Sequence, residues 1–502
     1  MVKAKKIELY GRLGGKSGWQ AADIEAARQD FAKKAGKEIP ENAMVHKAWM
    51  VMLVRLGTVE RERGVSILRA LAGVDERAIA EMVERFDPDY PKPIYQLENY
   101  LTNAVGAVAS DVNLGRTIPP PFYRLAVREA LVDLIEATLS FRTGLVDLAA
   151  GHTRTVMPGY THFQHAQPTT FGHYLMSLYD AIDRASNQVE AAYAQANVCD
   201  LGCGACSGTS FKVDRLLAAE LLGFDGIQEN SNDCVASTDH AVDAICACTN
   251  LIVPLGRVAN ELDVWHSFEY DMVEVADDIA SPSSMMPQKK NPSVFEYARM
   301  RVAHVMSGYT DIVGMAHGLP YGDICDIKEI SMRACPTIRT TAHALREMKR
   351  VFEGLIVKPD IMLKRAAAGF STASELAATL YREAGVPLRL AHGVVAEVVR
   401  AVWKDGGLSQ AITNEIVNAA AEKVTGESAG LSDESLARAL DPIAFVEAHT
   451  SQGGVAPVEV ERMIGERRKT LAAAEQRHVQ RLERLEAAAK RLDAEVAALI
   501  GQ

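Results

Sequence analysis

Residues 281–316 read SPSSMMPQKKNP followed by SVFEYARMRVAHVMSGYTDIVGMA. The prolines and serines of the first half mark an irregular loop, and Asn291 before Pro292 is typical of an N-cap with proline at the first helical position. In the second half, apolar residues recur three and four apart, which predicts a long helix that packs lengthwise against other helices. These apolar positions are Phe295, Ala298, Val302, Val305, Tyr309, Ile312 and Ala316.

The predicted loop brings lysines and serines to a helix N-terminus, where free N–H groups and about half a positive charge favour carboxylates. Removing a proton from carbon beside a carboxylate makes a dianion, which an enzyme must bind better than it binds the substrate. Lys289 and Asn291 are suitable donors, and a desolvated Ser283 in an electropositive loop is our candidate base. A solvated polar loop whose serines cap a helix explains the same residues equally well.

Several segments beyond this loop carry a family resemblance. SSMMPQKKNP (283–292), GYTHFQHAQP (159–168) and LGCGACSGT (201–209) resemble signatures of the aspartase and fumarase superfamily. PQKKNP, with GVPLRLAH (385–392) and GGVAP (453–457), is most similar to its argininosuccinate lyase branch. The likeness spans nearly the whole chain.

The resemblance implies an all-α fold of three helical domains, at 1–110, 111–360 and 361–502, with a central bundle of long helices. It implies a carbon-nitrogen lyase without metal or organic cofactor, in a homotetramer whose active sites combine segments of three subunits. Ser283, His162, Lys289 and Glu296 would be catalytic, with His162 paired to Glu296. The substrate-binding residues would be Ser110, Asn113, Arg116, Thr161, Gln164, Ser284, Asn291 and Tyr321.

The sequence departs from that branch where the leaving amine is recognised. After Gly115 the family's second Arg-Asn pair is missing, Ser293 replaces an aspartate, and the segment after Tyr321 is rewritten. The family's SDRD is disturbed at 237–240, which reads STDH. In the first of these segments, Ser110, Asn113, Arg116 and Thr117 either hold a carboxylate or form an ordinary capping loop.

We therefore predict elimination of an amine from an aminosuccinate such as ethylenediamine disuccinate or iminodisuccinate, with release of fumarate. Authentic argininosuccinate lyase is the first alternative. A non-catalytic structural protein resembling lens δ-crystallin is the second.

Charge and composition limit the other classes of function. With 54 basic and 65 acidic residues the net charge is −11, which argues against nucleic-acid binding. No signal peptide is evident and no apolar run approaches the length of a membrane span, so we expect a cytoplasmic protein without a membrane partner. The eight cysteines could suggest a metal or cluster site, but we expect free thiols. His162 and His165 have no third ligand at matching spacing.

The rest of the chain reads as helix. Helices are expected over 21–72, 75–86, 94–108, 122–151, 169–198 and 234–276. After Pro457, Leu471, Leu485, Leu492 and Leu499 share one heptad stripe, which predicts a long amphipathic helix on the oligomer's surface or against a neighbour. The glycine-rich residues 11–18 are too closely spaced for a phosphate loop and are expected to be an exposed arm.

Overall fold

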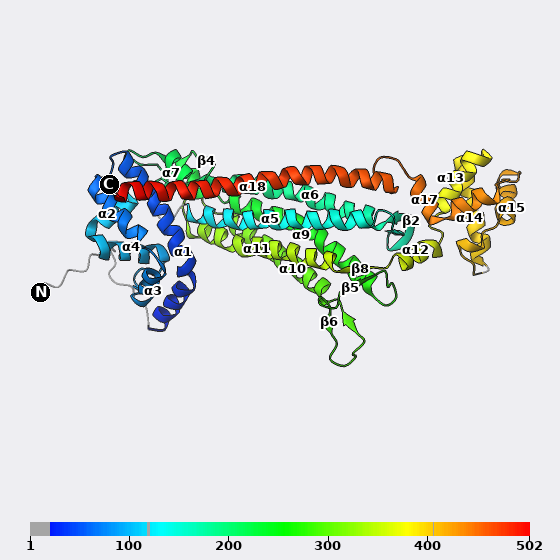
Figure 1. Ribbon diagram of the computed structural model, residues 1–502, viewed down its shortest axis with the longest axis horizontal. Coiled ribbons are helices and arrows are strands. Elements are labelled where there is room, and N and C mark those ends of the chain that lie inside the picture. Colours follow the sequence, from blue (N-terminus) through cyan, green and yellow to red (C-terminus); the bar gives the residue numbers. More distant parts are fainter. Residues whose placement is uncertain (1–20, 118–120, 405, 502) are drawn as a thin grey trace.

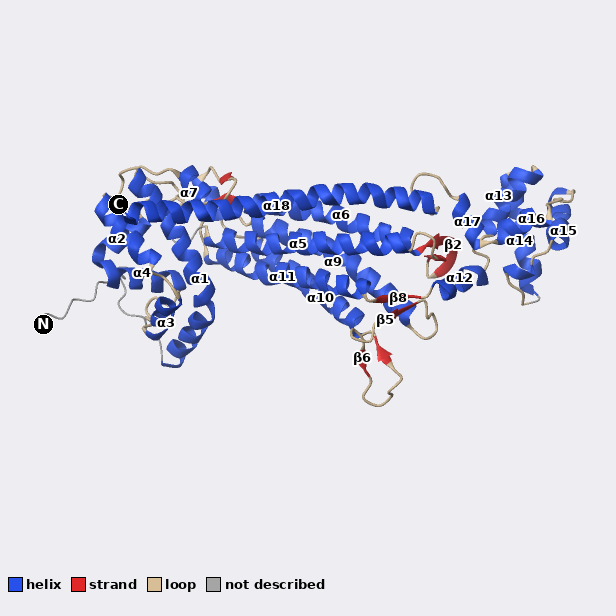
Figure 2. Cartoon of the chain, in the orientation of Figure 1, coloured by secondary structure: helices blue, strands red, loops and turns tan. Residues whose placement is uncertain are grey.

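The computed structural model describes residues 21–117, 121–404 and 406–501, so the predicted glycine-rich arm at 11–18 lies outside the described residues. The molecule is elongated, with long helices in the middle and a group of shorter helices at each end (Figure 1). Nearly all of the described secondary structure is helical (Figure 2), which confirms the all-α prediction. The central bundle consists of α5 (Phe122–Gly151), α6 (Phe171–Ala196), α9 (Asp239–His266), α10 (Ser293–Ala316) and α11 (Cys325–Glu353).

The bundle core follows the apolar periodicity of its helices. Phe295, Val305 and Ile312 of α10 are fully buried, as the pattern predicts. Helices α9 and α10 approach closely at Gly256, where an added Cβ would lie 2.7 Å from Cγ2 of Val302. Only glycine allows this approach, which fixes α10 against the bundle.

The amino-terminal helices form a second core. They are α1 (Ala21–Arg55), α2 (Arg61–Ala72), α3 (Glu76–Glu84), α4 (Pro93–Val105) and the 3₁₀ helix η1 (Gly106–Asn113). The segment after α6 joins them, with β3 (Val198–Cys199), α7 (Arg215–Leu221), β4 (Gly226–Ile227) and α8 (Ser231–Ala236). Trp49 and Leu201 are buried in this core together. The second core therefore takes in residues well beyond the 1–110 division.

The other end of the molecule holds α12 (Pro359–Ala368), α13 (Ala373–Ala384), α14 (Leu388–Lys404), η2 (Ser409–Ala411), α15 (Asn414–Thr425), α16 (Asp433–Leu440) and α17 (Pro442–Ala448). Helices α13 to α16 enclose a third core, whereas Phe445 of α17 and Ala366 of α12 pack with Val156 in a separate small cluster. Figure 1 shows them beyond the end of the bundle, joined to it through α12 and α17.

The last helix, α18 (Pro457–Gly501), is the single long amphipathic helix that the leucine stripe predicts. It runs back along α5 and α6 to the amino-terminal helices (Figure 1). Leu471 joins the bundle core, and Leu492 joins the amino-terminal core. Arg467 forms a bidentate pair with Asp180 of α6, at 2.9 and 2.8 Å. The apolar stripe is thus buried against the helix's own chain.

The remaining strands are short antiparallel pairs: β1 (Val156–Thr161) with β2 (Gln164–Thr170), β5 (Val273–Val275) with β8 (Leu355–Val357), and β6 (Ser281–Pro282) with β7 (Lys290–Asn291). The predicted N-cap is wrong by one residue. Asn291 belongs to β7, opposite Ser281, so Pro292 becomes the N-cap and α10 begins at Ser293. Strand pairing here overrides the local helix-start signal.

One described helix, α9, is long and apolar enough to cross a membrane by length and composition alone, so the expectation that no run reaches this length is wrong. In this fold 56% of its most apolar window is buried inside the molecule. The core helix of a bundle passes the same test, because it is apolar on most of its circumference.

Candidate active site

The loop that carries Ser283 forms a hairpin that stands away from the bundle (Figure 1). Its base is fastened in two places. The hydroxyls of Ser281 and Ser293 are hydrogen-bonded, and Lys290 forms ion pairs with Glu274, at 2.6 Å, and with Asp277. Ion pairing with these carboxylates raises the pKa of Lys290. Lys290 therefore anchors the hairpin, while its neighbour Lys289 is exposed within the loop.

Ser283 is hydrogen-bonded in a way that favours a negative oxygen. Its Oγ accepts the backbone N–H of Met286 at 3.1 Å and, less closely, that of Met285 at 3.4 Å. Donors to an oxygen stabilise its deprotonated form. Ser284 is exposed beside it, and Asn291 donates its side-chain N–H to the carbonyl of Pro282 at 3.4 Å. The loop thus brings three predicted site residues around the candidate base without blocking it.

The second signature forms the β1–β2 hairpin. Thr161 pairs with Gln164, and both residues of the two-residue turn, His162 and Phe163, have positive φ angles of 53° and 59°. Such a turn normally needs asparagine or glycine, so this tip is strained. Phe163 is also 85% exposed. Strain and an exposed aromatic side chain together indicate a tip shaped for contact with something outside this chain.

The first-signature residues lie on or just after η1. Ser110 donates to the carbonyl of Ala107 at 2.8 Å, and Asn113 donates to Glu98 at 3.1 Å while its own Oδ1 is buried without a hydrogen-bond partner. A buried oxygen without a hydrogen-bond donor lowers the stability of the fold, so Asn113 Oδ1 is available to accept a hydrogen bond from a ligand.

Arg116 is buried rather than open to solvent. Its Nε donates to the carbonyl of Val112 at 2.8 Å, and its guanidinium contacts His46. Burial, and after it the charge of Arg116, lowers the pKa of His46 well below its usual value. Binding of a substrate carboxylate by Arg116 stays a prediction.

Tyr321 lies between α10 and α11, and its side chain is 70% exposed. Its hydroxyl donates to Asp233 at 2.5 Å, and Asn232 donates to its carbonyl at 3.4 Å. The hydrogen bond from Tyr321, followed by the one from Gln228, lowers the pKa of Asp233. Asp233 is therefore an ionised carboxylate that accepts the hydroxyl of Tyr321 and holds this side chain in place.

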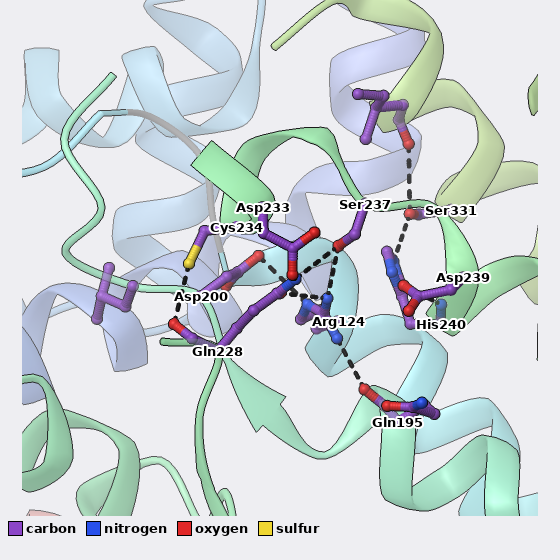
Figure 3. Close-up of polar contacts among 12 residues, drawn as sticks. Arg124, Gln195, Asp200, Gln228, Asp233, Cys234, Ser237, Asp239, His240 and Ser331 are labelled. Atoms are coloured by element: carbon purple, nitrogen blue, oxygen red, sulfur yellow. Dashed lines mark hydrogen bonds and ion pairs between the residues drawn. The ribbon is translucent and has the colours of Figure 1, made fainter. Parts of the chain in front are cut away.

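Sequence reasoning missed the buried polar network behind Asp233 (Figure 3). Arg124 of α5 donates to Gln228 at 2.6 Å and to Ser237 at 3.0 Å, and lies 3.5 Å from Asp200. Burial raises the pKa of Asp200 to about 6 although Arg124 opposes this. The signal that could have revealed the network is the segment at 237–240, where an unchanged Ser237 accepts from Arg124 and the altered last position supplies His240.

The same segment supplies a buried histidine. His240 bonds through Nε2 to the hydroxyl of Ser331 at 2.9 Å, and its Nδ1 is buried without a partner. Burial, and next the charge of Arg124, lowers the pKa of His240 well below its usual value. His240 is therefore neutral inside this network.

Within a single chain, the three segments that carry the predicted site residues lie far apart. Figure 1 shows the β1–β2 hairpin at one end of the bundle, α4 beside the opposite end, and the β6–β7 hairpin projecting from the side between them. Within the described residues, no hydrogen bond or ion pair joins His162 to Glu296. No group of three or more His, Cys, Asp or Glu residues among the described positions could hold a metal ion, and all eight cysteines are free thiols.

Comparisons with known proteins cover most of the chain. Residues 27–307 match the family described as lyase, and residues 370–447 match the argininosuccinate lyase C-terminal family. The argininosuccinate lyase of Methanosarcina barkeri is 35% identical over 463 residues, covering 90% of this chain and 91% of that protein. That of Methanosarcina acetivorans is 36% identical over 443 residues, covering 86% and 87%.

Among solved structures, a variant of EDDS lyase with bound fumarate is 29% identical, with a TM-score of 0.83 and 97% of each chain covered. Together these matches support release of fumarate by cleavage of a carbon-nitrogen bond. The chain belongs to the lyase family, in the argininosuccinate lyase branch of the aspartase and fumarase superfamily, and is a carbon-nitrogen lyase.

Proposed function

We propose that this lyase reversibly eliminates an amine from an N-substituted aspartate other than argininosuccinate, such as ethylenediamine disuccinate (EDDS) or iminodisuccinate. Ser283 takes the proton from the carbon beside a carboxylate, and Lys289 and Asn291 stabilise the resulting dianion. Breaking the carbon-nitrogen bond then gives fumarate, and the leaving amine carries away a proton. The substrate carboxylates are held by Thr161, Gln164, Ser284 and the first-signature residues. His162, paired with Glu296, relays a proton or orients the site.

The observation that carries this proposal is the pair of backbone N–H groups on Ser283 Oγ. A serine hydroxyl is a poor base in water because its alkoxide is unstable there. The two fixed donors lower that cost, and closure of the assembled site to water around Ser283 and Lys289 would lower it further.

We further propose that the site is assembled in a homotetramer. The β1–β2 tip, η1 and the Ser283 hairpin lie far apart in one chain, so a site that uses all three needs other copies. Helix α10 supports such an assembly, because four of its residues are buried while Tyr297, Met300 and Met306 are exposed large apolar side chains. Large apolar side chains exposed around the free side of a long helix are typical of an interface.

The leaving amine is inferred from what surrounds Tyr321 and Ser293. Ser293 stands where the branch has an aspartate, and its hydroxyl is bonded to Ser281, so this position offers no carboxylate to a cationic leaving group. The structural likeness to EDDS lyase supports an aminosuccinate substrate. Authentic argininosuccinate lyase is the second candidate, favoured by 35–36% identity to two such enzymes.

Fumarate absorbance tests the proposal. The protein is incubated separately with argininosuccinate, EDDS, iminodisuccinate and aspartate, with the Ser283→Ala variant as the blank. Fumarate from EDDS or iminodisuccinate, absent in the variant, supports the proposal. Fumarate mainly from argininosuccinate supports the second candidate, and no fumarate from any of the four contradicts both and favours a δ-crystallin-like structural role.

A further inference from the structure

Two cysteines from distant parts of the chain share a small buried cluster. Cys203 lies in the loop after β3 and Cys234 lies in α8; they are 1% and 5% exposed and pack together with Val235. The two thiols lie close enough to influence each other's ionisation. Both are free thiols, and neither takes part in the proposed elimination. The chain thus holds a preformed dithiol.

Cys234 has the surroundings of a reactive thiol. Arg215 donates to its Sγ at 3.2 Å, and the protonated thiol donates to the carbonyl of Gln228 at 3.1 Å. Interaction with the Cys203 thiol and the charge of Arg215 lower the pKa of Cys234 to about 7 against the effect of burial. Interaction with Cys234 and burial raise the pKa of Cys203, which therefore keeps the proton. A thiolate beside a guanidinium is the form that reacts with oxidants.

A small cavity reaches Cys234. It has a volume of about 30 Å³, and Arg124, Asp200, His240 and Lys328 also line it. Because one water needs roughly 10–15 Å³ of such volume, the cavity can hold a molecule as small as hydrogen peroxide but not a bulky disulfide. Polar side chains of Asp200 and Arg124 face it, and both carry a buried atom without a hydrogen-bond partner.

We propose that Cys203 and Cys234 are an oxidation site that forms a reversible disulfide with a small hydroperoxide. The Cys234 thiolate attacks one peroxide oxygen, the O–O bond breaks, and the released hydroxide takes a proton and leaves as water. Cys203 then attacks the sulfur of the Cys234 sulfenic acid, the S–O bond breaks, and a second water leaves. Two thiols and one hydrogen peroxide thus give one disulfide and two waters.

The disulfide would tie together two segments that carry predicted substrate-binding residues. Next to Cys203, Gly204 forms a bridge with Arg116. Next to Cys234, Asp233 holds the hydroxyl of Tyr321. Oxidation would therefore fix the first-signature segment relative to Tyr321. The proposal does not depend on the identity of the amine substrate.

The test treats the full-length protein with hydrogen peroxide, alkylates the remaining thiols in denaturant and maps the peptides. Trypsin cleaves after Lys212 and Arg215, so the two cysteines fall on separate peptides, 185–212 and 216–257. We expect a Cys203–Cys234 cross-link that dithiothreitol reverses. A cross-link through Cys206, or oxidation of exposed Cys206 and Cys325 while the pair stays reduced, would overturn the proposal.

Three variants separate the role of Cys234, which reacts with the peroxide, from that of Cys203, which closes the disulfide. In Cys203→Ala, Cys234 should accumulate as a sulfenic acid that dimedone traps, whereas Cys234→Ser should leave Cys203 reduced. Cys206→Ser, the control, should cross-link like the unaltered protein. In the unaltered protein, limiting hydrogen peroxide at pH 7 should oxidise Cys234 at least about tenfold faster than Cys248, which is buried and whose pKa is raised to about 12. Equal rates would contradict the assignment without any variant having to fold.

Discussion

The hydroxyl of Tyr321 donates a hydrogen bond of 2.5 Å to Asp233, which lies 88 residues earlier in the chain. Tyr321 is otherwise largely exposed, so this contact and the weaker one from Asn232 fix its position. Any substrate that touches Tyr321 therefore depends on Asp233, which was not among the residues predicted from sequence.

Replacing Asp233 with asparagine should raise KM for the aminosuccinate more than it lowers kcat. A hydrogen bond to a charged group contributes about 1.5–3 kcal/mol, so a loss of roughly 10- to 100-fold in kcat/KM is expected. Tyr321→Phe should give a similar loss, and the double variant should lose little more, because both changes remove one interaction. Additive losses would show that the two residues act separately.

Replacing Ser283 with alanine should lower kcat by about 10²–10⁴-fold, the usual contribution of a positioned general base. Melting temperature should not change, because Ser283 lies in a projecting loop. The matched control is Met285→Ala, which alters an 88% exposed side chain and keeps the backbone N–H that faces Ser283. Near-normal activity in Ser283→Ala would refute the base assignment.

Helix positions were largely predictable from sequence. The helices expected over 122–151 and 293–316 are observed with the same bounds, because their apolar periodicity and their buried faces agree. The helix expected over 21–72 is instead two helices, since a turn after Arg55 separates α1 from α2. Gly57, with a φ of 70°, marks that turn, and the sequence prediction did not use it.

The hairpins were not predictable in the same way. Strands β1 and β2 lack alternating apolar residues, and their turn places His162 and Phe163 in a conformation that those residues disfavour. The contacts of Asp233, Arg124 and His240 join segments that are remote in sequence, so no local pattern indicates them. The motifs in the sequence indicated which residues are candidates for the site, whereas the hydrogen-bond partners of those residues became known only from the fold.

Replacing Phe163 with asparagine should stabilise the protein slightly, because asparagine tolerates the left-handed conformation. Relief of about 1 kcal/mol is expected, measured as a rise in melting temperature. If the tip contacts a neighbouring subunit, the same variant should lose activity. A fall in stability together with unchanged activity would contradict both the strain and the proposed role of the tip.

Stability should fall on acidification in part because of His240. Its pKa is held well below 6.5 in the folded state, so below about pH 6.5 the unfolded chain binds a proton that the folded chain does not. The free energy of unfolding should then fall by up to about 1.4 kcal/mol per pH unit from this residue. The contribution of His240 to stability is fully present above the pKa of histidine in the unfolded chain, and it is lost as the pH falls toward the lower pKa of His240 in the folded protein.

The His240→Gln variant isolates this effect. Between pH 6.5 and 5, its free energy of unfolding in urea should fall less steeply than that of the unaltered protein. Asp200, whose folded pKa is raised to about 6, acts in the opposite direction in both proteins, so it cancels in the difference. Parallel pH curves would mean that His240 is protonated in the folded state.

The central claim is that the active site is assembled from segments that one chain holds apart. Subunit mixing tests it most directly: Ser283→Ala and His162→Asn, each inactive alone, are unfolded together, refolded as mixed oligomers and assayed for fumarate. With random mixing, about a quarter of the sites should regain both intact residues, so activity should return. Mixed oligomers that form and stay inactive would place Ser283 and His162 of one site on the same subunit and contradict the account.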